Sequence, residues 1–357
     1  MSLWVVVGGQ YGGEGKGKIS AFITQKQEVD ICIRCGGPNS GHSFVAADGT
    51  TKLLRQLPTG YVRPETRLLI PAGGLIDLDV LKGELDYFGL WSRVGIDRNA
   101  MIIEDRDRSR ELELKLRERL SSTLCGVGSA VARRTLRGVD VRLASQAAKD
   151  VSWLEGLITN VSDEANSAVD SGKGVLVEGT QGFGLSLYHS ESYPKATSRD
   201  TTAAAFLSEV GLSPRSVTQI VVVFRTFPIR VAGEQAGPMK DEITWDILQK
   251  ESGYPYPIEE MTTVTKKTRR VARFDYDLAV AAAQVNRPTM VAVNGLDYLD
   301  FSIRRVKDCA SLSRRPVEFL AKLSEVLNVP ITYCGTGPGL DEVAVDERKA
   351  CGLLMAV

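Results

Sequence analysis

The chain has no excess of charge of either sign, since 44 lysine and arginine residues balance 44 aspartate and glutamate residues. A neutral balance provides no long-range field that would attract a polyanion. The basic stretch from Lys266 to Arg273 is short and local. We therefore expect no nucleic-acid partner.

Long apolar runs are also missing. No run approaches the roughly 18 residues that a membrane-spanning helix needs. The opening segment MSLWVVVGG has no positively charged start, and its short apolar run ends at glycine, which is typical of a buried strand and not of a signal peptide. These features predict no membrane partner and a cytoplasmic location.

Cysteine is scarce and scattered. The six cysteines, at positions 32, 35, 125, 309, 334 and 351, form no disulfide framework in a chain of 357 residues. Cys32 and Cys35 are spaced as CxxC, but they lie on an expected strand, where residues three apart face opposite sides. No second CxxC exists to complete a metal site. We predict a reducing compartment and no metal or redox role for this pair.

What the sequence does contain is a regular alternation of two patterns. Short apolar runs rich in β-branched residues predict buried strands at Trp4 to Val7, Asp30 to Arg34, Arg67 to Ile70, Ala100 to Ile103, Val175 to Val177, Ile220 to Phe224, Thr289 to Val293 and Ile331 to Tyr333. Helical patterns occur at Lys16 to Gln25, Leu75 to Phe88, Arg108 to Leu120, Trp153 to Ser171, Phe274 to Gln284 and Pro316 to Leu327. The alternation predicts an α/β fold with a P-loop-like, largely parallel central sheet flanked by helices.

No repeat or Ser/Pro-rich linker divides the chain, so we expect one domain over residues 1–357. Two regions interrupt the alternation, Leu120 to Ala148 and Ala232 to Arg273, where Gly, Pro, Thr and basic residues cluster. Such loop and helix excursions commonly carry function.

The first strand leads directly into the loop GGQYGGEGKGK and then into a helix. Glycines allow backbone N–H groups to converge on an oxyanion, while Lys16 and Lys18 add full positive charges. The segment Gly12 to Lys18 matches GxxxxGK, but Ile19 replaces the Ser or Thr that holds Mg²⁺ in a P-loop. The loop predicts triphosphate binding; the alternative is a merely structural tight turn.

This loop closely resembles the GQWGDEGKGK opening of the adenylosuccinate synthetases, which join aspartate to IMP with GTP. Six further motifs resemble that family in the same order, and together they span most of the chain: CGGPNSGH (Cys35 to His42), VEGTQG (Val177 to Gly182), SYPKATSRDTT (Ser192 to Thr202), TTVTKKTRR (Thr262 to Arg270), NGLD (Asn294 to Asp297) and GTGP (Gly335 to Pro338). The resemblance implies a C–N-forming ligase of purine biosynthesis.

The implied reaction has two steps: the purine 6-oxygen attacks the γ-phosphoryl group, and the aspartate amine then displaces phosphate. Both steps develop charge on oxygen. The resemblance assigns catalytic roles to His42, Lys16 and Gln181, and it places Mg²⁺ on the backbone carbonyls of Gly13 and Gly41. For His42 alone, a packed core histidine is the alternative; His189, next to polar residues, is expected to be structural or at the surface.

The resemblance also assigns binding residues. For the donor nucleotide they are Gly12, Gly13, Glu14, Gly15, Lys16, Gly17, Asp297, Gly335 and Gly337. For the monophosphate substrate they are Gly13, Asn39, Thr123, Arg133, Gln181, Thr197 and Lys267; for aspartate, Val264, Thr265 and Arg269. Arg133 matches an arginine that reaches in from a second subunit, which implies a homodimer. Each polar residue alone could equally be an ordinary hydrogen-bonded loop residue.

The most informative departure from the family is Gly13, which stands where the family has the aspartate that accepts the N1 proton of IMP. A carboxylate beside N1 also lies near C2, so its removal opens space for a 2-amino group. Phage-type variants of the family have Ser or Gly here and make N6-succino-2-amino-2′-deoxyadenylate from dGMP and aspartate. The resemblance therefore implies dGMP as substrate, and the host cytoplasm as the location if the source is viral.

Other departures concern sugar and donor recognition. Lys267 and Thr268 replace family arginines, the first of which contacts the ribose, and Cys125 replaces an arginine expected near aspartate. Asp297 is retained, but Gly295 replaces a lysine that packs on the guanine of GTP. We therefore favour ATP or dATP as donor.

Two alternatives stay open. One is an ordinary adenylosuccinate synthetase that acts on IMP, aspartate and GTP, with a water replacing the lost base. The other is a catalytically silent nucleotide-binding protein, which explains Gly13 but not the retention of Lys16, His42, Gln181 and Arg269. If dGMP is the substrate, an ordered water or the γ-phosphate must accept the guanine N1 proton.

Overall fold

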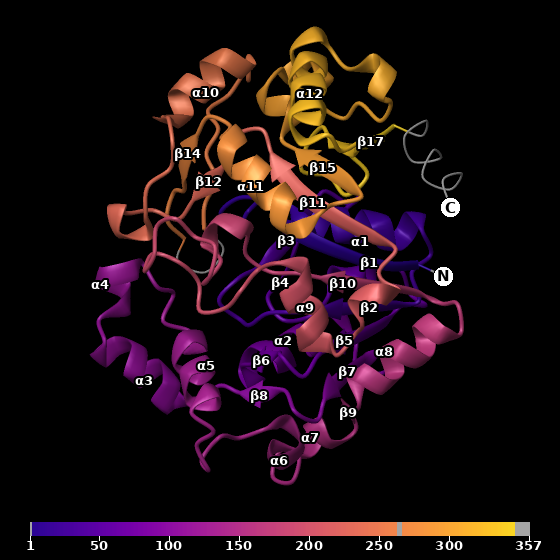
Figure 1. The fold of residues 1–357 in the computed structure, drawn as a ribbon, viewed down its shortest axis with the longest axis vertical. Helices are drawn as coiled ribbons and strands as arrows, with labels where there is room; N and C mark the ends of the chain where they lie inside the picture. Colours follow the sequence, from indigo (N-terminus) through magenta and orange to yellow (C-terminus); the bar gives the residue numbers. More distant parts are fainter. Residues whose placement is uncertain (1, 263–265, 347–357) are drawn as a thin grey trace.

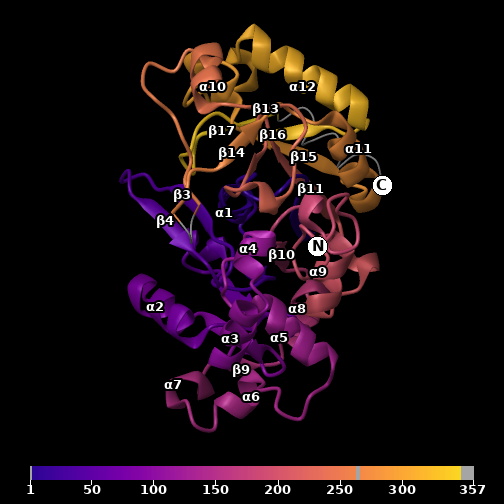
Figure 2. The same cartoon turned by 90° about the vertical axis from the view of Figure 1, so that its left-hand side faces the viewer.

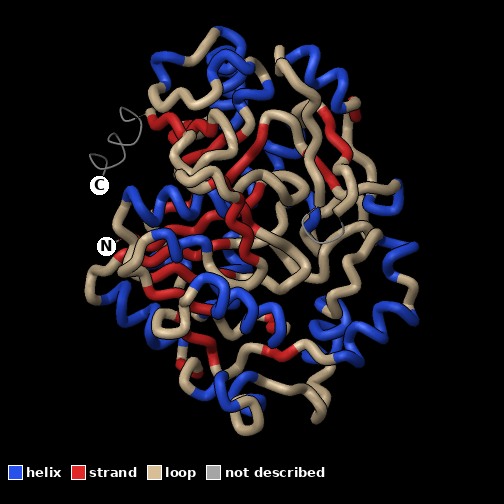
Figure 3. Tube along the Cα trace, turned by 180° about the vertical axis from the view of Figure 1, so that it is seen from behind, coloured by secondary structure: helices blue, strands red, loops and turns tan. Residues whose placement is uncertain are grey.

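The computed structural model describes residues 2–262 and 266–346, and a large sheet runs through its centre with helices around it (Figure 1, Figure 3). Within these residues the sheet has ten strands in the order β17, β16, β15, β11, β1, β10, β2, β5, β7 and β9. Their bounds are β1 Ser2–Gly8, β2 Ile31–Arg34, β5 Arg67–Ile70, β7 Val94–Asp97, β9 Ile158–Thr159, β10 Gly174–Glu178, β11 Gln219–Arg225, β15 Met290–Asn294, β16 Ile331–Gly335 and β17 Val343–Val345. Neighbouring strands are parallel except for β16 and β17. The prediction of an α/β fold on a largely parallel sheet is confirmed.

The sheet is buried on both faces, as the continuous apolar runs of its strands predict. On β1, Leu3, Val5 and Val7 join one core, whereas Trp4 and Val6 join the other, because successive side chains of a strand point to opposite faces. The first core contains side chains of helices α8 (Val161–Asp170), α9 (Ala203–Val210), α11 (Tyr276–Asn286) and α12 (Arg314–Leu327). The second contains those of α1 (Lys16–Lys26), α2 (Leu78–Phe88), α6 (Ala144–Ala147) and α7 (Ser152–Glu155).

Two excursions from the sheet lie on the same side of the molecule (Figure 1, Figure 2). The first carries α3 (Asp105–Glu113), α4 (Leu116–Leu120) and α5 (Val127–Thr135). The second carries α10 (Trp245–Ser252) and a three-stranded sheet of β12 (Ile229–Arg230), β14 (Arg270–Ala272) and β13 (Glu242–Ile243). A hairpin of β3 (His42–Val45) and β4 (Thr51–Leu54) stands beside them. Both interruptions predicted from the sequence therefore correspond to these excursions.

Two predicted elements were wrong in extent or placement because two short strands pair outside the main sheet. The helix expected over Leu75 to Phe88 begins only at Leu78, since β6 (Leu75–Ile76) pairs with β8 (Met101–Ile102) in a separate two-stranded sheet. The Asp77 side chain then caps α2 by accepting from the Val80 backbone N–H. The strand expected at Ala100 to Ile103 is thus β8, outside the main sheet.

Two other predicted helices are each divided. The pattern from Arg108 to Leu120 is α3 followed by α4, with Lys115 between them in the left-handed region at φ 51°. The pattern from Trp153 to Ser171 is α7, then β9, then α8, because residues 158–159 pair with β7. Apolar residues on both sides of a short break keep helical spacing, so periodicity alone does not show the break. In the described part of the chain, no helix is long and apolar enough to cross a membrane.

Candidate functional site

The glycine-rich loop follows β1 in the middle of the sheet and leads into α1. Three of its glycines have left-handed backbones, with φ of 79° at Gly12, 77° at Gly13 and 85° at Gly15, which caps α1. Residues with a Cβ rarely adopt this conformation, so the glycines permit the tight path that ends at the helix start. The loop lies at the carboxyl end of a central parallel strand, where ligands of open α/β sheets bind.

Glu14 holds the loop together from inside. Its fully buried carboxylate accepts from the backbone N–H groups of Gln10 at 3.0 Å and Gly12 at 2.9 Å through Oε1. Its Oε2 accepts from Lys16 Nζ at 2.7 Å. A buried ion pair that also satisfies backbone donors fixes its members in one geometry. Lys16 is thereby held at the wall of the cavity described next.

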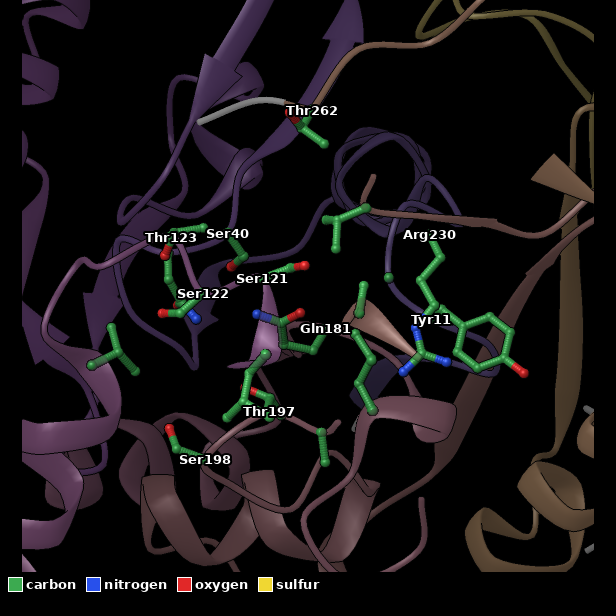
Figure 4. A pocket seen from close by; sticks show the side chains of 18 of the residues that line it. Tyr11, Ser40, Ser121, Ser122, Thr123, Gln181, Thr197, Ser198, Arg230 and Thr262 are labelled. Carbon is green, nitrogen blue, oxygen red and sulfur yellow. The ribbon is translucent and has the colours of Figure 1, made fainter. Parts of the chain in front are cut away.

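Beside the loop is a cavity of about 260 Å³ with both polar and apolar lining residues. Figure 4 shows Gln181 in its middle, with Ser40 and the serines and threonine of residues 121–123 on one side and Thr197 on another. Seven predicted site residues line it besides Gly12, Gly13 and Lys16: Asn39, Gly41, His42, Thr123, Gln181, Thr197 and Arg269. They come from both excursions, from the segment before β3 and from the loop after β10. The structure thus brings together residues that are up to 257 positions apart (12 to 269).

His42 is buried at 6% exposure and contacts the fully buried Glu178 through Nδ1. The Arg34 guanidinium contacts His42 Nδ1 and also donates to Glu178 Oε1 at 3.0 Å. Thr59 donates to the other carboxylate oxygen from its backbone N–H at 2.9 Å and its hydroxyl at 2.8 Å. With Nδ1 turned to Glu178, Nε2 is the ring nitrogen available to the cavity.

Electrostatics keep this histidine neutral at neutral pH. Burial, followed by the Arg34 charge, lowers the pKa of His42 to about 3, although Glu178 acts in the opposite direction. For Glu178, burial alone would raise the pKa, but His42 and Arg34 outweigh it and lower the pKa. Because the Glu178 carboxylate accepts from Nδ1–H, Nε2 of the neutral ring carries no proton. The ring must therefore gain a proton before Nε2–H can donate to an oxygen that gains negative charge, and the adjacent Glu178 carboxylate stabilises the imidazolium that forms.

At Gly13 the loop presents no side chain to the cavity. A Cβ built there would lie 3.0 Å from Ile229 Cδ1 and 3.3 Å from an Nη1 of Arg269. The Gly13 carbonyl accepts from Arg225 at 3.0 Å, and Arg225 pairs in turn with Glu260. The Arg269 guanidinium therefore lies close to the point from which a side chain at position 13 would project.

Away from the cavity, the end of β15 contacts the glycine-rich loop, and the loop after β16 contacts α1. Asn294 Nδ2 donates to the Glu14 carbonyl at 2.7 Å. The buried Lys18 donates to the carbonyls of Gly337 at 2.6 Å and Glu342 at 2.7 Å. Gly337, predicted to bind the donor nucleotide, therefore contacts Lys18 of α1, and Asn294, three residues before Asp297, contacts Glu14 of the glycine-rich loop.

Some predicted residues lie elsewhere or outside the described residues. Arg133 pairs within its own chain, with Asp107 at 2.7 Å and Glu104 at 2.9 Å, and lines a separate hollow between α3 and α5. Lys267 is exposed and is not among the described residues that line the cavity. Val264 and Thr265 lie outside the described residues.

Two cysteines singled out by their spacing are buried away from solvent. Burial raises the pKa of both the Cys32 and the Cys35 thiol well above its ordinary value. Over residues 2–262 and 266–346, no group of three or more His, Cys, Asp or Glu side chains is placed to hold a metal ion.

The sequence did not single out several residues that the structure places at the site. Glu178 belongs to the motif VEGTQG, yet only the fold shows that it contacts His42. Arg230 is buried beside the cavity, stacks 4.7 Å from the Tyr11 ring and donates to the carbonyls of Lys195 and Pro238 at 2.8 Å each (Figure 4). It therefore ties the segment that carries Thr197 to the second excursion. No local pattern marks such a contact.

The adenylosuccinate synthetase family model matches residues 5–151 and 142–303. The adenylosuccinate synthetase of Thermococcus onnurineus is 42% identical over 353 residues, covering 98% of this chain and 99% of its own. That of Pyrococcus horikoshii is 40% identical over 349 residues, covering 96% and 98%.

Two solved structures share the fold. One is the fully ligated adenylosuccinate synthetase of Plasmodium falciparum, with a TM-score of 0.83 and 20% identity over 97% of this chain and 100% of that chain. The other is the succinoaminodeoxyadenylate synthetase of cyanophage S-2L bound to dGMP and dATP as an energy donor. It has a TM-score of 0.81 and 27% identity over 99% of this chain and 98% of that chain.

Proposed function

Because this chain belongs to the adenylosuccinate synthetase family, we propose that its purine substrate is dGMP, which it joins to L-aspartate with ATP or dATP as phosphate donor. The broader activity follows from the family: it is a C–N-forming ligase of purine nucleotide biosynthesis that joins aspartate to a purine nucleotide. The proposed products are N6-succino-2-amino-2′-deoxyadenylate, ADP or dADP, and phosphate.

The observation that carries the choice of dGMP is Gly13. The loop offers no carboxylate to the cavity at this position, and the nearest side-chain groups to a Cβ there are Ile229 and the Arg269 guanidinium. A carboxylate beside N1 of the purine would crowd a 2-amino group, whereas glycine leaves room for it. The phage structure with dGMP and dATP, which is similar over nearly the whole chain, supports this proposal.

The proposed chemistry has two balanced steps. The guanine 6-oxygen forms a bond to the γ-phosphorus while the bond to the β,γ-bridging oxygen breaks, so ADP or dADP leaves and N1 loses its proton. The aspartate amine then bonds to C6, phosphate departs with the 6-oxygen, and the amine gives up a proton. An ordered water or a γ-phosphate oxygen accepts the N1 proton, because position 13 supplies no base.

We assign three side chains to these steps. Lys16, held by Glu14 at the cavity wall, neutralises the transferring phosphoryl group. His42, oriented by Glu178 and protonated once the anionic substrates are bound, donates from Nε2–H to the 6-oxygen as it becomes a leaving group. Gln181 hydrogen-bonds to the monophosphate from the middle of the cavity.

Of the two backbone carbonyls predicted to bind Mg²⁺, those of Gly13 and Gly41, only one is well placed to do so. Gly41 lines the cavity, but the Gly13 carbonyl already accepts from Arg225, whose positive charge disfavours a second cation on that oxygen. Mg²⁺ commonly binds through substrate phosphates with few protein ligands. When bound, it neutralises charge on the phosphates. We therefore propose Gly41 and the phosphates, more than Gly13, as its ligands.

The remaining binding assignments stay proposals. Asn39, Thr123 and Thr197 line the cavity for the monophosphate, and Arg269 offers its planar guanidinium to an aspartate carboxylate. By resemblance to the family, Val264 and Thr265, which lie outside the described residues, are also assigned to aspartate, and Lys267 is assigned to the sugar. Asp297 and the glycines of residues 335 and 337 take the donor's base. Arg133 contacts the monophosphate of a partner subunit in a homodimer.

A second candidate is an ordinary adenylosuccinate synthetase that acts on IMP and GTP. The observation that favours it is the 42% identity to the Thermococcus onnurineus enzyme, which exceeds the 27% identity to the phage enzyme. This candidate must also replace the missing carboxylate at Gly13. The third candidate is a catalytically silent nucleotide-binding protein. The presence of Lys16, His42 and Gln181 around one cavity argues against it.

One assay separates these candidates. The protein is incubated with aspartate, Mg²⁺ and ATP, dATP or GTP, and IMP, GMP or dGMP is supplied in turn while succinyl-nucleotide and phosphate are measured. Turnover with dGMP is expected; turnover with IMP alone rejects the proposal, and none with any substrate favours the silent protein. Crystals with dGMP test the proton acceptor, since a water or phosphate oxygen must lie within hydrogen-bonding distance of N1.

A further inference from the structure

A buried tyrosine donates a hydrogen bond to a buried carboxylate in the turn that follows β15. The hydroxyl of Tyr254 donates to Asp297 Oδ2, and both residues are almost inaccessible, at 7% and 3% exposure. Tyr254 follows Gly253, the residue that ends α10, so it arrives from the second excursion, 43 residues before Asp297. Asp297 lies in the turn that follows β15.

The tyrosine is held in place by its ring. Its centroid lies 4.6 Å from that of Phe301 and 5.6 Å from that of Tyr298. The Arg304 guanidinium lies 5.9 Å from the ring centroid. Aromatic contacts on several sides restrict the ring, so the hydroxyl has little freedom to leave Asp297.

Asp297 has a polar environment with little compensating charge. Burial raises the pKa of its carboxyl group, while the Tyr254 hydrogen bond and the Lys18 charge act in the opposite direction. Lys18 itself donates to the carbonyls of Gly337 and Glu342 and does not pair with Asp297 in the contacts of the described residues. Among the described side chains, the Tyr254 hydroxyl is thus the one that donates a hydrogen bond to this buried carboxylate.

We propose that Tyr254 is a specificity-determining residue for the phosphate donor, which disfavours a guanine nucleotide by occupying one oxygen of Asp297. This inference rests on the proposed placement of the donor's base beside Asp297. Guanine presents two adjacent donors, N1–H and the 2-amino group, which match two carboxylate oxygens in parallel. Adenine presents one donor, the 6-amino group, beside the acceptor N1. The Tyr254 hydrogen bond takes up part of the accepting capacity of Oδ2, so the two-donor edge of guanine loses more from it than the single donor of adenine, which can bind at Oδ1.

The test is Tyr254→Phe, which removes the hydroxyl and retains the ring. The kcat/KM values for ATP and GTP are measured with aspartate and whichever monophosphate the enzyme uses. The ratio of GTP to ATP is expected to rise about tenfold, the value of one hydrogen bond to a charged group. An unchanged ratio overturns the inference. A fall in GTP use also overturns it, because the hydroxyl would then be an acceptor for guanine.

Tyr256→Phe is the matched control. Its hydroxyl accepts from Arg304 and its ring lies in the same aromatic cluster, but within the described residues it makes no hydrogen bond to Asp297. The donor ratio of this variant is expected to equal that of the wild type. Thermal melting of both variants checks that the fold is retained, and a merely structural role of Tyr254 would lower stability without moving the ratio.

A further variant, Asp297→Asn, separates failure of the inference from failure of the placement on which it rests. Binding of non-hydrolysable ATP and GTP analogues is measured by calorimetry, so no turnover is needed. If Asp297→Asn changes neither affinity, the base does not lie beside Asp297, and both the placement and the inference fall. If it changes them but Tyr254→Phe leaves their ratio constant, only the inference falls.

Discussion

The carboxylate of Glu178 contacts Nδ1 of His42, and Arg34 and Thr59 hold that carboxylate at the carboxyl end of β10. His42 lines the cavity together with Lys16 of the glycine-rich loop, whereas Glu178 is fully buried behind His42. Because Glu178 orients the ring, Nε2 rather than Nδ1 faces the proposed 6-oxygen.

We expect His42→Asn to lower kcat by about a hundredfold or more, the usual effect of removing a positioned proton donor or acceptor. KM for the monophosphate should change much less, since the cavity retains its other polar residues. His189→Asn is the matched control: the only other histidine in the sequence is exposed and stacks on Phe183, so its replacement should leave kcat unchanged. Equal losses in both variants would contradict the assignment.

The same histidine predicts a pH dependence of stability. The pKa of His42 is lowered from 6.5 to about 3 in the folded protein, so between these values the unfolded state binds a proton that the folded state does not. The free energy of unfolding must therefore fall as pH decreases from about 6.5 towards 3.

Denaturant unfolding measured across this pH window should show a smaller fall for His42→Asn than for the wild type, because the variant has lost this contribution. His189→Asn should retain the full fall. A wild-type curve that parallels the His42→Asn curve would show that His42 titrates normally in the folded protein.

Position 13 can be tested with a pair of nearly isosteric variants. Gly13→Asp and Gly13→Asn both add bulk beside Ile229 and Arg269, and both residue types tolerate the positive φ better than most. Both should lower turnover of dGMP by crowding the 2-amino group. Turnover of IMP should rise only in Gly13→Asp, because asparagine cannot accept the N1 proton. Unchanged dGMP activity in both variants would mean that position 13 does not face the purine.

The proposed role of Arg133 across a dimer can be separated from its ion pairs with Asp107 and Glu104. Arg133→Ala should raise KM for the monophosphate and have low activity alone. When it is mixed and reassembled with His42→Asn, one site of each heterodimer regains both residues. Random pairing should then restore about a quarter of the wild-type activity. No recovery in verified heterodimers would place the role of Arg133 within its own chain.

Much of the fold could be predicted because each central strand is buried on both faces and therefore carries a continuous apolar run. The strands β5 and β11 and the helices α1 and α12 were predicted nearly to their observed ends. The predictions failed where two short elements share one apolar pattern, as for α7, β9 and α8. There the pairing of residues 158–159 with β7 decided the outcome, and pairing with a distant strand leaves no local mark.

By itself, the sequence determined the family and the position of the glycine-rich loop after the first strand, because motif order and local glycine spacing can be recognised without knowledge of the fold. It also identified Gly13 as a departure from the family, since comparison of the two loop motifs shows glycine where the family has aspartate. Only the tertiary structure decided that Arg269 and Ile229 stand beside Gly13, that Glu178 orients His42, and that Tyr254 covers Asp297. The physical reason is that each of these contacts joins side chains that are far apart in the chain. Folding alone brings them together, and only then do they bury one another and shift one another's pKa values.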